Sequence, residues 1–195
     1  MRVGSSSAYP FFNNLKKYNT MACLLTSGRA LPCKSSVGGL KAVYFADYGT
    51  LGATTIASGE ITALAGTPSF FKFDIKGNSS LETTINSSRE NGTTFYTQTL
   101  NLTLPVLDKA TQEEIKILAT ARPHVAIEDY NGNFFMVGLE HGAEVTGGTI
   151  VSGAAMGDLS GFTLTLEGQE TDPAYFVTST VITANESSRQ IDPNA

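Results

Sequence analysis

The sequence predicts a mainly β fold in which a sheet of antiparallel strands carries one flanking α-helix. Residues 93–142 show this most clearly, because they read as a strand, a helix and a hairpin in turn. From Tyr96 to Leu104 apolar and polar residues alternate, which is typical of a strand with one buried face and one polar face. Gln98 interrupts the apolar face.

A helix is predicted directly after this strand. Pro105 ends the strand because proline has no amide hydrogen to donate to a neighbour. Asp108 or Thr111 can cap the helix, and Thr111 has capping-box spacing to the glutamate three positions later. Ile115 and Leu118 share one face, so we expect that face to be buried.

The third part of this unit is a hairpin whose turn contains Asn131 and Gly132. This dipeptide is the strongest short hairpin signal in the chain, and it joins predicted strands at 124–129 and 134–139. We expect a positive φ at Gly132. The side-chain oxygens that recur from Asp129 onward also resemble the start of a calcium loop, but the glycine falls too early and strands flank it. The pattern therefore favours a plain turn without metal.

Further strands are predicted on both sides of this unit. They lie at Lys41–Ala46, Ala53–Ala57, Glu60–Leu64, Phe70–Ile75, Leu81–Asn86, Glu144–Val151 and Phe162–Leu166. After Thr171 only residues 175–184 have the composition of a structured segment. The sequence therefore predicts a β domain at 41–170, an N-terminal arm at 1–40 and a C-terminal extension at 171–195. Residues 1–20 are either a translated leader, with Met21 as the natural start, or part of the arm.

Composition and charge favour a component of an assembly. Only 16% of the 195 residues are charged, and the net charge is −5. Residues 1–46 contain no acid, so all 18 acidic residues lie in the rest of the chain. A basic arm on an acidic body can bind nucleic acid or the acidic body of the next subunit. The arm lacks dense clusters of lysine and arginine, which favours the second interpretation.

The residue types that carry catalysis or bind metals are sparse. Cys23 and Cys33 form no CxxC motif, and we expect a reduced pair, although one disulfide is possible in an exported chain. His124 and His141 are not at ligand spacing to a cysteine. We therefore expect no metal, no cofactor and no enzymatic activity, and the apolar runs are too short for a transmembrane helix.

Two long stretches of the chain resemble a family of viral structural proteins. The hairpin DYNGNFFMVGLEHG and the later run GAAMGDLSGFTLTLEGQE are similar to tail-tube-like and neck-ring proteins of tailed bacteriophages that infect Bacteroidetes, including crAss-like phages. The resemblance covers roughly residues 41–170. It implies a small β-sandwich or barrel with one helix, assembled into a six-fold ring in the virion, with other tail or neck proteins as partners. DNA would pass transiently through an acidic lumen, and the acid-free residues 1–46 would lie outside the lumen or between rings.

Contacts between subunits are predicted at a polar loop, residues 86–93, which is expected to project from the body. Arg89, Glu90 and Asn91 are its interface candidates, because Arg89 can form a two-pronged bond to a carboxylate. The carboxylates offered by the acidic body include Glu140, Glu144 and Asp158. The alternative function is an exported β-sandwich binding or adhesin domain, which should have a signal sequence and aromatic platforms, and neither is visible.

Overall fold

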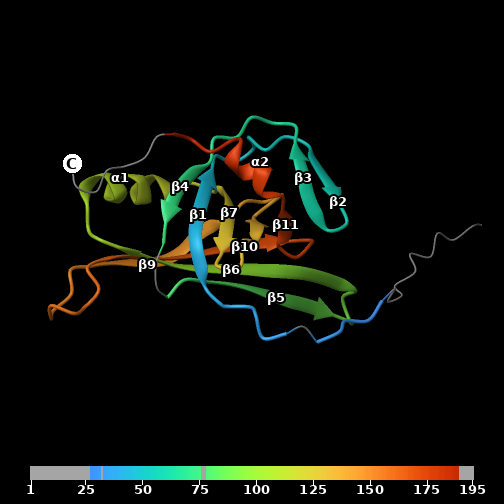
Figure 1. The fold of residues 1–195 in the computed structure, drawn as a ribbon, viewed down its shortest axis with the longest axis horizontal. Coiled ribbons are helices and arrows are strands. Elements are labelled where there is room, and N and C mark those ends of the chain that lie inside the picture. Colours follow the sequence, from blue (N-terminus) through green and yellow to red (C-terminus); the bar gives the residue numbers. More distant parts are fainter. Residues whose placement is uncertain (1–26, 32, 76–77, 189–195) are drawn as a thin grey trace, which may run out of the picture. The chain divides into compact units, whose positions relative to one another are not determined.

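The computed structural model describes residues 27–31, 33–75 and 78–188. The chain divides into two units, residues 1–35 and 36–195, and all strands and helices of the described residues lie in the second (Figure 1). The strands are β1 (Leu40–Ala46), β2 (Thr54–Ala57), β3 (Glu60–Leu64), β4 (Phe71–Asp74), β5 (Ser80–Ser88), β6 (Thr93–Pro105), β7 (His124–Asp129), β8 (Phe134–Val137), β9 (Glu144–Val151), β10 (Gly161–Glu170) and β11 (Tyr175–Val177). The helices are α1 (Lys109–Leu118) and α2 (Ser179–Thr183). The predicted class, a mainly β sandwich with a flanking helix, is confirmed.

The smaller sheet has four strands in the order β5-β6-β10-β9, and every neighbouring pair is antiparallel. One face of this sheet is apolar and buried, as the alternation in β6 predicts. Its fully or nearly fully buried side chains are Leu100, Leu102, Leu104, Phe162, Leu164 and Leu166. Gln98 lies on the same face and is also buried. The opposite face consists mainly of threonine, asparagine, serine and glutamate side chains.

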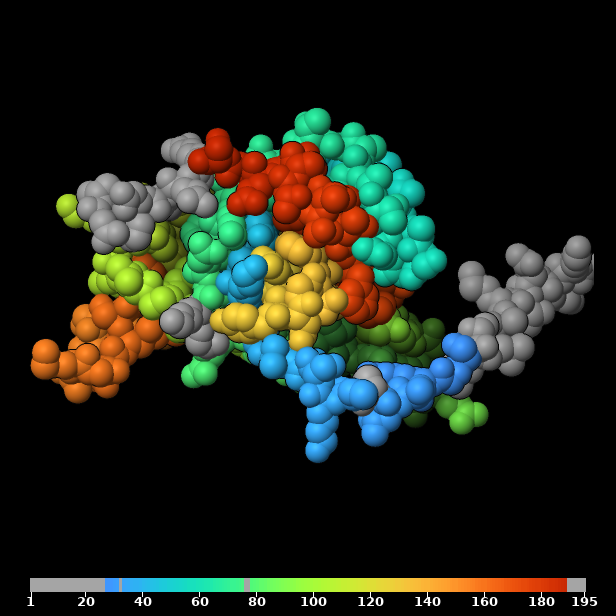
Figure 2. Space-filling view, viewed as in Figure 1, coloured from blue at the N-terminus to red at the C-terminus, as the bar shows by residue number. Residues whose placement is uncertain are grey.

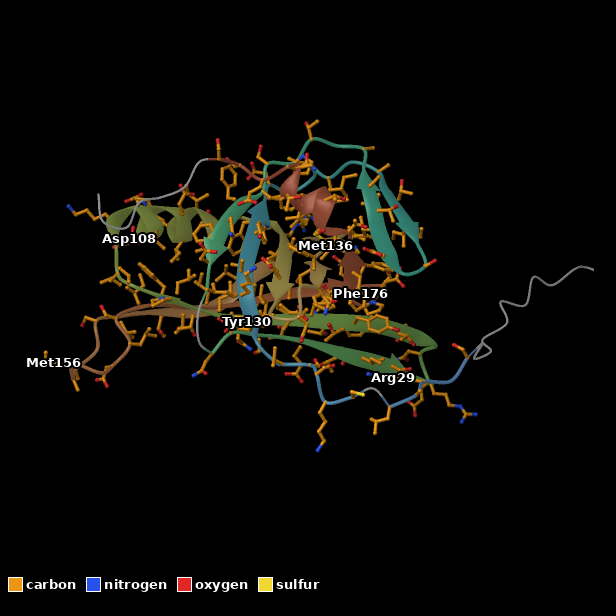
Figure 3. All side chains as sticks on the ribbon, in the orientation of Figure 1. Arg29, Asp108, Tyr130, Met136, Met156 and Phe176 are labelled. Carbon is orange, nitrogen blue, oxygen red and sulfur yellow. The ribbon has the colours of Figure 1, made fainter. Side chains whose placement is uncertain are left out.

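The larger sheet has seven strands in the order β2-β3-β11-β8-β7-β1-β4. One of its faces packs on the smaller sheet through Val43, Phe45, Val125, Ile127 and Val137, forming the first core. The other face packs on α2 and the neighbouring loops, where a second core includes the labelled Met136 (Figure 3). Burying each large aliphatic or aromatic side chain contributes about 1.5–3 kcal/mol to stability. The first core therefore fixes the smaller sheet on the larger one, and the second core fixes α2 and the neighbouring loops on the opposite face of the larger sheet.

Helix α1 begins at the capping residue Asp108, which settles the choice that the sequence leaves open. The Asp108 carboxylate accepts a hydrogen bond of 2.8 Å from the backbone N–H of Thr111. Burial alone would raise the pKa of Asp108, but the hydrogen bonds from Thr111 outweigh it and lower the pKa. Ile115 and Leu118 are buried in the first core, as predicted. The helix thereby covers one end of the apolar face.

Half of the expected loop at 86–93 is strand, which corrects the prediction. β5 continues to Ser88 and β6 begins at Thr93, so only residues 89–92 form the turn. The polar side chains of this hairpin bond to each other across the two strands, including Asn86 to Thr97 at 2.8 Å. A composition of Ser, Asn and Thr is typical of loops, but here it belongs to paired strands that are exposed to solvent.

The C-terminal segment adds to the larger sheet. β11 pairs in parallel with β3 and antiparallel with β8, which makes β3·β11 the one parallel pair among the strands of the described residues. Figure 2 shows the orange-red residues of β11 and α2 beside the β2–β3 hairpin. Phe70 also bonds to Asn185 and Ser187 through its backbone. The expected leader, the start at Met21 and Cys23 lie outside the described residues, and Cys33 is exposed.

Candidate assembly surface

The solvent-exposed face of the smaller sheet carries only negative charge. Its side chains alternate with the buried ones along each strand, and on neighbouring strands they lie opposite one another. They are Ser80, Glu82, Thr84, Asn86, Ser88, Thr93, Phe95, Thr97, Thr99, Asn101, Thr103, Thr163, Thr165, Glu167, Gln169, Glu144, Thr149 and Val151. No lysine or arginine occurs among them. We call this surface the polar face.

The acids of the polar face lie in one row across the sheet. Glu82 pairs with Thr99, Thr99 with Glu167, and Glu167 with Glu144, so the row crosses all four strands. Directly opposite side chains have Cβ atoms about 4.5–5.5 Å apart, and like charges at that spacing destabilise a sheet. Glu167 and Glu144 therefore repel each other. The repulsion is a cost to the single subunit that folding alone does not explain.

The two edges of this sheet are open. In the described part of the chain, β5 pairs only with β6 and β9 pairs only with β10. An exposed edge strand presents unpaired N–H and C=O groups to any other strand. Both edges are long, with nine residues in β5 and eight in β9. Both edges are therefore available for pairing with a further strand.

The interface candidates predicted from sequence lie at opposite ends of the sheet and do not meet within one subunit. Arg89, Glu90 and Asn91 form the exposed β5–β6 turn, where the backbone N–H of Asn91 donates to the Ser88 hydroxyl at 3.3 Å. Asp158 lies at the other end, in the exposed loop between β9 and β10. The antiparallel pairing of β6 with β10 places these two turns at opposite ends, as Figure 1 shows. Any contact between them joins different subunits.

The loop that contains Asp158 has its own internal order. The Asp158 carboxylate accepts hydrogen bonds from the backbone N–H groups of Ala154 and Ala155, at 3.0 and 2.7 Å, and these bonds lower its pKa. Met156 at the tip is fully exposed and points away from the body (Figure 3). One carboxylate oxygen of Asp158 thus holds the loop, and the side chain stays exposed.

The predicted turn at Asn131 and Gly132 is built around Asp129. The Asp129 carboxylate accepts hydrogen bonds from the backbone and side-chain N–H groups of Asn131 and Asn133, at 2.7–3.1 Å. Burial alone would raise the pKa of Asp129, but these bonds outweigh it and lower the pKa. Gly132 has a φ of 81°. Asn131 also bonds to the backbone of Val37, so the turn holds the chain that leads into β1.

A buried polar cluster holds the loop between β8 and β9, and little in the local sequence pattern predicts it. Gln98 accepts a hydrogen bond from the Gly138 N–H at 3.0 Å and donates to the Asp172 carbonyl at 3.2 Å. Glu170 is 4% exposed and accepts from the backbone N–H groups of Glu140 and His141, at 3.1 and 2.8 Å. The one local signal is a glutamine within an apolar stripe.

The same cluster brings together three groups that can bind a metal. One ligand atom each from Glu140, His141 and Glu170 lies within 4.8 Å of the others. Both Glu170 oxygens are already engaged, one by the loop backbone and the other by the His141 ring at 3.1 Å. These contacts support a structural role in fixing the loop.

His124 supports the same loop from the side of β7. Its Nδ1 lies 2.6 Å from the Gly138 carbonyl, and its Nε2 accepts from the Gly49 N–H at 3.0 Å. Since Nε2 accepts, Nδ1 carries the proton and the ring is neutral. Burial lowers the pKa of His124, and the nearby Arg122 lowers it further, against the Gly138 bond and the charge of Glu170.

No protein-family model, no curated protein and no solved structure matches this chain. Among the described residues, no helix combines the length and the apolar character needed to cross a membrane. The polar face and the two open edges are therefore the features from which a function can be inferred.

Proposed function

We propose that this protein is a virion structural subunit that forms a ring or tube in the tail or neck of a tailed bacteriophage, without catalysis. DNA passes through the ring, and the polar face lines the channel. The observation that carries this proposal is that every charge on the polar face is negative. The resemblance of residues 41–170 to tail-tube-like proteins supports the same assignment.

A channel for DNA must not hold the phosphate backbone. Double-stranded DNA carries one negative charge per about 1.7 Å of its axis, and lysine and arginine bind it by releasing counterions. A wall of hydroxyl and amide groups with a row of carboxylates offers no cationic site for phosphate. Screening limits the repulsion to about 10 Å at 0.1 M salt, so it acts close to the wall. This charge pattern favours sliding over binding.

The order and direction of the strands suit closure into a barrel. The four strands alternate in direction, so β5 and β9 run opposite to each other. When copies are related by rotation about an axis along the sheet, β9 of one copy lies antiparallel to β5 of the next. This holds for any number of copies, and closure removes both open edges. The family resemblance suggests six copies.

Electron microscopy of the purified full chain over a range of concentrations tests this proposal. We expect rings or tubes with a central channel, together with sedimentation of a closed oligomer at high concentration. Obligate interfaces of this kind bury about 2,000 Å² or more, so the oligomer should persist on dilution. A chain that stays monomeric at every concentration would overturn the proposal.

A further inference from the structure

Each open edge of the smaller sheet has an uncovered isoleucine on its apolar side. Ile85 of β5 is 64% exposed and Ile150 of β9 is 55% exposed. The register shows that both point to the side of the first core, because Ile85 pairs with Tyr96 and Ile150 with Phe162. They are at opposite ends of the sheet as well as on opposite edges. Within one subunit neither can cover the other.

A groove of about 350 Å³ opens beside β5 on this same apolar side. Its lining includes Leu81 and Thr83 of β5, Ile127 and Phe135 of the larger sheet, and residues 37–39 of the chain that leads into β1. Any strand that pairs with the edge of β5 places its inward-facing side chains next to this groove. The inward-facing residues of β9 are Val145, Gly148 and Ile150, and Ile150 is the large one left uncovered.

Pairing the two edges without a displacement along the strands is unfavourable. In that arrangement the row of acids continues directly into the next subunit, so Glu144 lies opposite Glu82 of its neighbour. Like charges directly opposite are destabilising. Only the first residues of β5, near Ser80, would overlap β9, because β5 extends beyond β9 toward its turn. Most of both edges would stay unpaired.

The tilt of strands in a barrel requires such a displacement. Four strands about 4.8 Å apart span about 19 Å, so a tilt of about 35° displaces the next subunit by about 13 Å, or about four residues. The direction of this displacement follows from how much of β9 can pair with β5. Moving β9 toward the β5–β6 turn lengthens the shared ladder, whereas the opposite direction separates the two strands.

We propose that β9 of one subunit pairs with β5 of the next at a displacement of about four residues, which places Ile150 on Leu81 at the mouth of the groove. Through β10, Ile150 is level with Leu104 of β6, whereas Leu81 pairs with Leu100 of β6, so the two positions differ by four residues along the sheet. The displacement also brings Val145 level with the exposed Ile85. This inference rests on the proposed ring and adds the register of its interface.

The same displacement removes the opposition of acids. Glu82 comes to lie opposite Thr149 of the neighbour, and Glu144 opposite Asn86. Displacements of about two or six residues leave Ile150 opposite a residue other than Leu81 and do not bring Val145 level with Ile85. A displacement of about four residues thus covers Ile150 on the apolar side and separates the acids on the polar side.

Cysteine cross-linking of the full chain tests the register. In a Cys23→Ser, Cys33→Ser background, Leu81→Cys is combined with Ile150→Cys in one variant and with Val145→Cys in the control. Opposed Cα atoms of antiparallel strands are about 4.5–5.5 Å apart, within disulfide range. Within one subunit three strand spacings, about 14 Å, separate residue 81 from residue 145, and residue 150 lies farther away, so neither pair can bridge internally.

We expect mild oxidation to link the 81/150 variant into covalent multimers that reducing agent dissolves, and to leave the 81/145 control monomeric on a denaturing gel. Rings that cross-link through 81/145 and not through 81/150 would overturn this register and leave the proposed function intact. Absence of rings in the unmodified chain would overturn both. The two failures are therefore distinguishable.

A second pair of variants tests the role of the side chain. Ile150→Asn removes the apolar contact from a residue that is already exposed in the subunit, and Thr149→Asn is its neighbour on the polar face. We expect Ile150→Asn to keep the melting temperature of the monomer and to raise the concentration needed for assembly about tenfold or more, as losing a buried aliphatic contact would. Equal assembly of the two variants would contradict the proposed contact.

Discussion

Gly132 is the residue whose backbone sets the hairpin between β7 and β8. Its φ of 81° lies in the left-handed region, and a Cβ there would meet no atom within 4 Å. A substitution therefore acts through backbone strain and not through a clash. We expect Gly132→Val to lower the free energy of unfolding by about 1 kcal/mol or more in denaturant titrations.

The matched control for that substitution is Gly157→Val. A Cβ at Gly157 would also meet no atom within 4 Å, but its φ is outside the left-handed region. We expect the control to change stability by less than about 0.5 kcal/mol, as exposed sites usually do. Equal losses of stability at the two positions would show that the positive φ of Gly132 does not explain the effect of its substitution.

His124 makes the stability of the fold depend on pH. Its pKa in the folded protein is below the ordinary value of 6.5, mainly because of burial. When the pH falls, the unfolded chain therefore binds this proton before the folded chain does. The stability that the neutral ring contributes is complete above pH 6.5 and is lost as the pH falls toward the folded pKa. A protonated ring could no longer accept the Gly49 N–H.

Thermal melts between pH 7.5 and 5 measure this contribution. We expect the melting temperature to fall with pH in the unmodified chain, and to fall less in a His124→Gln variant, which has no group that titrates at this position. The comparison subtracts changes that both chains share, including those from carboxylates. If the two chains lose stability in parallel, His124 is not the group that titrates.

At the scale of elements, most strands could be predicted from the sequence, because the alternation of apolar and polar residues is a pattern within a short segment. The strand from Tyr96 to Leu104 and the helical face of Ile115 and Leu118 are present as expected. The Ser, Asn and Thr composition of residues 86–93 predicts a loop, but in the structure these side chains bond to one another across two paired strands. That pairing depends on register, which residue types alone do not determine.

The candidate surface was less predictable than the fold. Arg89 and Asp158 could be named from sequence, but the pairing of β6 with β10 that separates them joins segments far apart in the chain. The row of acids could not be predicted for the same reason, since Glu82, Glu167 and Glu144 come together only through three different strand pairs. Long-range register is needed for such a row, and no local pattern encodes it.

The β5–β6 turn remains the predicted contact between subunits or rings. Arg89 and Glu90 are both exposed there, and exposed charge pairs contribute only about 0–1 kcal/mol within a subunit. We expect Arg89→Ala to keep the melting temperature of the monomer and to weaken assembly in sedimentation, because it removes a two-pronged donor for a neighbour's carboxylate. Lys109→Ala, an exposed cation on α1, is the control. If the two variants assemble equally well, the turn is only a connector.

At the scale of the whole molecule, charge is distributed so that one surface of the sandwich differs from the rest. The net charge of −5 is moderate, and 13 basic residues are present in the chain. None of them lies on the polar face, although that face spans four strands. A subunit that only needed solubility could place both signs on this face, and mixing them would relieve the repulsion between Glu167 and Glu144. Keeping bases away from it fits the proposed passage of DNA.

Reversing charge on the polar face should convert a channel that DNA slides through into one that holds it. We expect rings of Glu82→Lys, Glu167→Lys to bind double-stranded DNA in a filter or gel assay at low salt, with affinity that falls steeply as salt rises, because lysines release counterions from the phosphates. The control is Asp47→Lys, Glu113→Lys, which changes net charge equally at exposed acids off this face. Both variants are first checked for ring formation by electron microscopy. Since net charge is matched, stronger binding by the first variant reports the position of the lysines, and equal binding by the two would contradict the assignment of the polar face to the channel.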